Sequence, residues 1–184
     1  MALIDRVKNI LLTPKTEWPT IAGETATPQS IYVPYVLILA AISPVAFLLR
    51  GGAFGATFAI LSYVIALAML FVLALIVDAL APSFGGEKNF VQSLKLTAYS
   101  CTAAWIGGIF NLLPFIGGLL GLLAALYSLY TFYLGAPVLR KCAAEKAVIF
   151  TIVIVVCAFV VGAVLAAILF GAGMGGMYGY GSMR

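Results

Sequence analysis

The feature that most constrains this chain is a stretch of 44 residues, 96–139, that contains no Asp, Glu, Lys or Arg. As one straight helix it would be about 66 Å long at about 1.5 Å per residue, roughly twice the thickness of a bilayer's hydrocarbon core. The stretch must therefore reverse direction. We expect the reversal over 111–118, because Pro114 disfavours a helical residue before it and Gly117-Gly118 permits a tight turn.

The composition of the whole chain places this stretch in a membrane. The 184 residues are 64% hydrophobic and only 9% charged, whereas a soluble domain carries about a quarter charged residues. We therefore predict an all-α, polytopic membrane protein with five transmembrane helices over 25–170, preceded by a short amphipathic N-terminal helix. The expected spans are about 28–49, 55–78, 94–113, 117–138 and 147–170.

The two ends of the chain differ from this apolar middle. Within 1–24, one helical face carries apolar residues, which favours a helix lying on the membrane surface, with Trp18 at headgroup level. The alternative is a disordered segment with chance periodicity, since short isolated helices are marginal in water. We expect 171–184 to be a flexible tail rich in Gly, Met and Tyr. The apolar face comprises Leu3, Ile4, Val7, Ile10 and Leu11.

The basic residues predict how the five spans are oriented. With the N-terminus inside, eight basic residues fall on the cytoplasmic side and two, Arg50 and Arg184, fall outside. Positive charge concentrates in cytoplasmic loops, so this distribution predicts a cytoplasmic N-terminus and an extracytoplasmic C-terminus. The eight are Arg6, Lys8, Lys15, Lys88, Lys95, Arg140, Lys141 and Lys146.

Several kinds of chemistry are disfavoured by what the sequence lacks. It contains no histidine, which removes histidine-based acid–base catalysis and the common histidine metal sites. Its three cysteines, Cys101, Cys142 and Cys157, have no paired spacing. Cys142 follows two basic residues, which would lower its thiol pKa, but no base accompanies it. We therefore expect that the protein is not an enzyme and that it binds no cofactor, metal or nucleic acid.

Polar residues within the apolar stretches are the candidates for an intramembrane site. An acid inside a membrane is a functional candidate, but Asp78 ends its span, and we favour an interfacial position because burying a lone carboxylate is costly. Three tyrosines recur every third residue and either pack the bundle or line a ligand groove closed by Asp78 and Arg140. The candidates are Asp78, Tyr127, Tyr130, Tyr133 and Pro137.

Three motifs occur in order along the chain: PKTEWPTI at 14–21, Gly85-Gly86 after the second span, and YSLYTFYLGAPVL at 127–139. Together they resemble the Yip family, five-span membrane proteins first known for binding Ypt and Rab GTPases, over about residues 10–170. The resemblance implies a five-helix fold with a cytoplasmic face used for interaction. Eukaryotic members carry an Asp-Leu-Tyr-Gly-Pro element that this chain lacks, so it resembles the prokaryotic branch and GTPase binding is not carried over.

The function predicted from these features is a non-enzymatic scaffold or adaptor in a bacterial inner membrane. Its basic cytoplasmic face would hold anionic lipid or a protein partner. The alternative is a small oligomeric transporter or channel that uses Asp78 and the tyrosines of the fourth span; small residues spaced four apart would permit a homo-oligomer. The candidate partner- or lipid-facing residues are Trp18, Gly85, Gly86, Arg140, Lys141 and Lys146.

Overall fold

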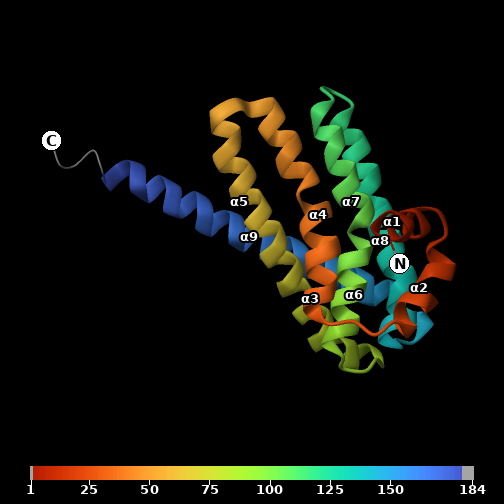
Figure 1. Cartoon of the computed structure of the whole chain (residues 1–184). Coiled ribbons are helices and arrows are strands. Elements are labelled where there is room, and N and C mark those ends of the chain that lie inside the picture. The colour runs from red at the N-terminus through yellow and green to blue at the C-terminus, as the bar shows by residue number, and fades with distance from the viewer. Residues whose placement is uncertain (1, 180–184) are drawn as a thin grey trace.

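The computed structural model describes residues 2–179, and these residues form helices and turns with no β-strand. Figure 1 shows a helical bundle from which the C-terminal helix leaves at an angle. The α-helices are α1 (Leu3–Leu12), α2 (Pro14–Gly23), α3 (Pro28–Ile31), α4 (Leu37–Ala40), α5 (Ile42–Leu80), α6 (Phe90–Ser100), α7 (Thr102–Gly107), α8 (Gly117–Arg140) and α9 (Ala147–Gly179).

Four segments of the described chain are long and apolar enough to cross a membrane: Pro28–Leu49, Ala59–Phe84, Gly117–Arg140 and Ala147–Leu165. The first two are joined through α5, which is helical from Ile42 to Leu80 but doubles back at the upper end of Figure 1. A π-helical turn, Tyr32–Val36, connects α3 to α4 around Pro34. Proline removes a helical hydrogen bond, which accounts for a widened turn at this point.

The third span expected from the sequence, 94–113, is not among the four apolar segments. It consists of α6, α7 and a 3₁₀ turn, Gly108–Leu112, and none of these pieces is long enough alone. The segment nevertheless lies at the centre of the bundle, because residues 93–100 are all buried and α6 packs against α5 and α8. Its lower apolar content comes from serine, threonine and lysine residues, of which Ser93, Lys95, Thr97 and Thr102 form hydrogen bonds inside the protein.

The chain then reverses at residues 113–116, where Leu113 is extended before Pro114 and Phe115 has a φ of 65°. The following helix, α8, returns along the bundle and ends at Arg140. Next, α9 begins against α5 and α8 and then leaves them (Figure 1). It remains helical to Gly179, so the described part of the expected tail is helical; 180–184 lie outside the described residues.

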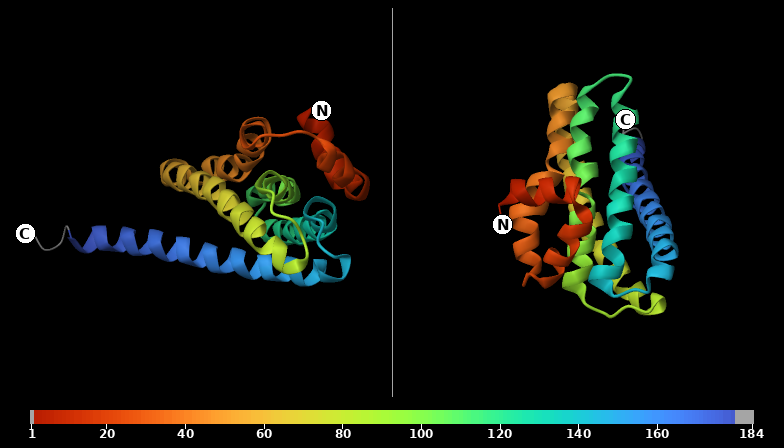
Figure 2. Two further views of the ribbon diagram at one scale, coloured as in Figure 1. Left: turned by 90° about the horizontal axis from the view of Figure 1, so that it is seen from below. Right: turned by 90° about the vertical axis from the view of Figure 1, so that its right-hand side faces the viewer.

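The N-terminal segment forms a helical hairpin, α1–α2, which packs on the side of the bundle rather than beyond its end (Figure 2). Ile10 is buried in the main core, and Leu3 and Val7 pack against that core. Ile4, in contrast, is 69% exposed. Much of the apolar face expected on the membrane surface is therefore covered by the protein's own helices.

Candidate functional site

The first junction joins the N-terminal hairpin to α8. The side chain of Trp18 is only 1% exposed and lies against Gly135. A Cβ atom added at Gly135 would lie 2.7 Å from Cε2 of Trp18 and 2.7 Å from Cδ1 of Leu96, closer than carbon atoms can approach. Glycine is therefore required at position 135 for the indole to enter, and two of the three sequence motifs meet at this contact.

The second junction lies at the lower end of the bundle and is centred on Arg140. Its guanidinium forms an ion pair with Asp78, with 3.1 Å between Nη2 and Oδ1. The same guanidinium donates to the carbonyl oxygens of Asn89, at 2.7 Å, and Glu87. The Asp78 carboxylate also accepts from the backbone N–H of Asn89 at 2.8 Å and from the hydroxyl of Ser93 at 3.2 Å. Asp78 is thus held by partners inside the protein.

The Gly85-Gly86 turn belongs to this second junction. Gly85 has a φ of +80°, a conformation that side chains disfavour, and Gly86 packs against the end of α8. A Cβ atom added at Gly86 would lie 2.5 Å from the carbonyl oxygen of Arg140. That same carbonyl accepts the backbone N–H of Glu87 at 3.2 Å. Glycine is therefore favoured at position 85 by the backbone conformation and at position 86 by the close approach to α8. These contacts fix the turn to the end of α8.

Only some of the residues that the sequence analysis expected to face a partner or lipid lie on the surface. Trp18 and Arg140 are each 1% exposed, so burial removes them from the face on which the sequence analysis placed them. Lys141, Lys146 and Gly85 are exposed, and Lys141 pairs with Glu87 at 3.0 Å. Gly86 is half-buried in the junction.

The tyrosines of α8 do not converge with Asp78. The hydroxyl of Tyr127 donates to the carbonyl oxygen of Leu11 at 2.7 Å and so attaches α8 to α1. Tyr130 and Tyr133 are exposed, at 43% and 37%. Tyr127 lies about 20 Å along the helix from Arg140, the residue that binds Asp78. The described side chains therefore place these candidates in two separate regions, with Pro137 half-buried in the last turns of α8.

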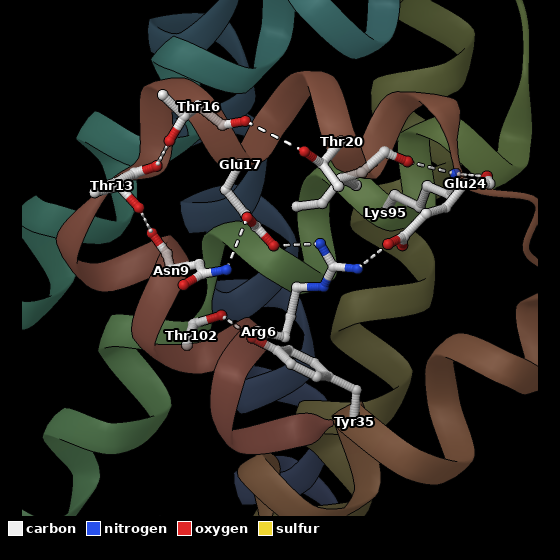
Figure 3. A network of polar contacts seen from close by, with 11 residues as sticks. Arg6, Asn9, Thr13, Thr16, Glu17, Thr20, Glu24, Tyr35, Lys95 and Thr102 are labelled. Carbon is white, nitrogen blue, oxygen red and sulfur yellow. Dashed lines mark hydrogen bonds and ion pairs between the residues drawn. The ribbon is translucent and has the colours of Figure 1, made fainter. Parts of the chain in front are cut away.

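The structure reveals a third polar cluster that the sequence analysis missed (Figure 3). The guanidinium of Arg6, on α1, forms ion pairs with the carboxylates of Glu17 and Glu24. Asn9 Nδ2 also donates to Glu17, at 3.1 Å. Burial alone would lower the pKa of Arg6, but the hydrogen bond and charge of Glu24, with the charge of Glu17, raise that pKa above its ordinary value. The arginine therefore stays charged.

Lys95 and two tyrosines complete this cluster from the centre of the bundle. The ammonium of Lys95 donates to the carbonyl oxygens of Ile21, at 2.8 Å, and Glu24, at 2.5 Å, at the end of α2. A cation at a helix C-terminus satisfies carbonyls that have no partner within the helix. The Arg6 guanidinium lies 5.6 Å from the ring centroid of Tyr99, whose ring meets that of Tyr35 edge-on at 4.7 Å.

A cavity of about 610 Å³ opens beside this cluster. Its walls come from α1, the linker after α2, the start of the first apolar segment and α6. The signal that could have indicated this site is the set of charges within the N-terminal hairpin, together with a lysine at position 95 inside an otherwise apolar region. The lining residues used below are Arg6, Gly23, Glu24, Pro34, Tyr35 and Tyr99.

These junctions define a class of protein: a multi-pass helical membrane protein whose N-terminal hairpin is docked on its bundle by buried polar contacts. Comparison with known families gives a match to the family described as "Yip1 domain", over residues 8–180. The chain therefore belongs to the Yip1 domain family. No curated protein and no solved structure matches it.

Proposed function

We propose that this protein is a non-enzymatic membrane scaffold or adaptor that presents one fixed end of its bundle to anionic lipid or to a protein partner. The observation that supports this is the junction at Arg140, which joins the 85–89 loop to the 141–146 turn. We call these two segments together the inner-end platform. Because Arg140 binds the carbonyls of Glu87 and Asn89, the platform has a defined shape rather than two independent loops.

The exposed charges on this platform favour anionic headgroups. Lys88, Lys141 and Lys146 are all exposed, accompanied by the exposed carboxylates of Glu87 and Glu145. A basic residue near an anionic membrane surface contributes about 1 kcal/mol of attraction. In this proposal the lysines attract the anionic headgroups, and the buried Arg140 fixes the positions of the two segments that carry them.

The proposed topology has five crossings, with α6, α7 and the turn Gly108–Leu112 as the third. In Figure 1 the 85–89 loop and the 141–146 turn lie at one end of the bundle, and the reversal at 113–116 lies at the other. An even number of crossings separates the first two, which fits this count. The positive-inside rule then favours a cytoplasmic platform in a bacterial inner membrane, with an extracytoplasmic C-terminus.

The transporter alternative has less support from the contacts. Its key acid, Asp78, is bound by Arg140, the backbone of Asn89 and the hydroxyl of Ser93. A carboxylate with these partners is an efficient structural link between α5, α6 and α8.

Lipid retention tests the proposal. The variant Lys88→Gln, Lys141→Gln, Lys146→Gln should retain several-fold less phosphatidylglycerol than the wild type, measured by native mass spectrometry after purification in mild detergent. The matched control replaces the same three lysines by arginine, which keeps the charge and should keep the lipid. Equal retention by the glutamine and arginine variants would contradict a lipid-binding platform.

Site-specific photo-crosslinking tests the protein-partner form of the proposal. A photoreactive residue at Lys141, which is exposed on the platform, should give a recurrent adduct in membranes. The control position is Leu119, which is 62% exposed near the other end of α8. The same adducts from both positions would show that the platform has no specific partner.

A further inference from the structure

The cavity beside Arg6 has the size and lining of a ligand site. Its volume of about 610 Å³ lies within the usual range of about 300–1,000 Å³ for small-molecule sites. Its lining combines a buried cation, Arg6, a partly exposed carboxylate, Glu24, and the aromatic residues Tyr35 and Tyr99. The π-helical turn Tyr32–Val36 forms part of one wall, and such turns occur often at functional sites.

The cavity also lies at the beginning of the first apolar segment, where a membrane-spanning helix would meet the lipid headgroups. The first apolar segment begins at Pro28, and Gly23, the last residue of α2, and Glu24, which follows it, lie just before that segment. Tyr35, on the inner wall, is about 10 Å further along that segment at about 1.5 Å per residue. The cavity therefore extends from the beginning of the first apolar segment to about 10 Å along it. It opens on the side of the bundle where the N-terminal hairpin packs (Figure 2).

The charges of the lining select among ligands. Arg6 is paired with both Glu17, whose side chain is 6% exposed, and Glu24, whose side chain is 38% exposed. Because Glu17 stays buried with Arg6, Glu24 is the carboxylate that can turn toward a ligand. A ligand with only negative charge would meet the Glu24 carboxylate, which would repel it. A ligand that carries both charges can bind Arg6 with its anion and Glu24 with its cation.

We propose that this cavity binds a phospholipid headgroup that carries a phosphate and a primary ammonium, as in phosphatidylethanolamine. The phosphate takes the Nη2 side of Arg6 that now faces Glu24, in the planar geometry that guanidinium groups offer to phosphate. The ammonium donates to the freed Glu24 carboxylate. Lys95 holds the carbonyl of Glu24 at 2.5 Å, so the backbone at the cavity rim stays in place during this exchange.

Native mass spectrometry of the whole chain in detergent, with equal amounts of phosphatidylethanolamine and phosphatidylglycerol, tests this site. The protein used carries Lys88→Gln, Lys141→Gln and Lys146→Gln, so that the inner-end platform adds no phosphatidylglycerol, and it should carry several-fold more phosphatidylethanolamine. Adding Glu24→Gln keeps the shape of the side chain but removes its charge, and should bring the ratio of the two lipids close to one. The control Asp5→Asn removes an exposed carboxylate on α1 that lines neither the cavity nor the platform, and should leave the ratio unchanged. Equal binding of the two lipids by the protein with an intact Glu24 would overturn the proposal.

A second variant tests the cavity without changing charge. Gly23 lines the cavity, and a Cβ atom there would meet no atom within 4 Å, so Gly23→Leu should narrow the cavity without disturbing the fold. It should reduce phosphatidylethanolamine binding several-fold. The control Gly118→Leu adds the same side chain at another open position, at the start of α8, and should bind as the wild type does. Equal binding by the two leucine variants would show that the lipid lies elsewhere and would overturn the proposal.

Soluble phosphoethanolamine distinguishes a membrane lipid from a free metabolite of the same chemistry. Displacement of the lipid by millimolar phosphoethanolamine would show that the headgroup alone is recognised, whereas retention would show that the acyl chains also contribute. This site and the inner-end platform depend on different residues. The phosphatidylethanolamine preference should therefore persist in the lysine-to-glutamine variant, and the phosphatidylglycerol test of the platform can fail without affecting it.

Discussion

The indole of Trp18 lies directly against Gly135, and this contact joins the N-terminal hairpin to the C-terminal part of α8. The fit depends on the missing Cβ atom, because both Trp18 and Leu96 would lie 2.7 Å from it. The contact explains why two motifs far apart in the sequence occur together. It also makes the hairpin a part of the folded bundle.

Gly135→Ala should therefore destabilise the protein. The added methyl group would force apart two large buried side chains, and overpacking of this kind costs about 1–3 kcal/mol. Thermal unfolding in detergent should show a lower midpoint. The matched control is Gly121→Ala on the same helix, where a Cβ atom meets nothing within 4 Å, and where alanine should be neutral or slightly stabilising. Equal midpoints for the two variants would contradict the contact.

Arg6→Met should loosen the hairpin while leaving the bundle folded. The substitution leaves Glu17 buried without its cation, and breaking a buried ion pair costs about 3–5 kcal/mol. Hydrogen–deuterium exchange should accelerate over residues 3–23 and change little in α8. Lys8→Met, at an exposed position on the same helix, is the control and should exchange at the wild-type rate. Equal protection in both variants would mean that Arg6 does not hold the hairpin.

Much of the architecture could be predicted from the sequence because apolar length determines it. The uncharged stretch 96–139 predicts a helical pair with a reversal, and the structure has that reversal at 113–116. The membrane class follows from composition alone. Membership of the Yip family, inferred from three motifs, is confirmed by the match over residues 8–180.

The roles of individual residues were harder to predict, because they depend on contacts between distant segments. A tryptophan just before the first apolar segment is typical of an interfacial anchor, yet Trp18 is buried against a glycine on another helix. An arginine at the end of an apolar helix is expected on the surface, yet Arg140 is buried, where it binds Asp78 and two backbone carbonyls. Lys95 marks a break in the apolar pattern, but only the fold shows that it binds the end of α2.

Cys142 should react slowly with alkylating reagents in the folded protein. Burial raises the pKa of its thiol more than the nearby Arg140 lowers it, so less thiolate is present at pH 8 than in an unfolded chain. In a Cys101→Ala, Cys157→Ala background, the rate with iodoacetamide should be lower in the folded than in the denatured protein. The difference should narrow as the pH rises through the raised pKa. Equal rates at pH 8 would contradict a buried, neutral thiol.

The ion pair between Asp78 and Arg140 provides the test that separates a structural role from a transport role. Asp78→Asn leaves the Arg140 guanidinium, whose side chain is fully buried, without its carboxylate. We expect a loss of about 3–5 kcal/mol in the free energy of unfolding, as for other broken buried pairs. Arg140→Met should also destabilise, because it removes the donors to the carbonyls of Glu87 and Asn89.

The double variant decides between the two roles. If the two residues act mainly through each other, Asp78→Asn combined with Arg140→Met should cost clearly less than the sum of the single variants, because no buried charge is then left unpaired. Chemical denaturation of the four proteins gives the coupling energy. A transport role predicts instead that Asp78→Asn abolishes an ion flux in reconstituted vesicles while the unfolding free energy stays at the wild-type value. That result would contradict the structural assignment, since a carboxylate that binds Arg140, Asn89 and Ser93 cannot be neutralised without weakening the junction.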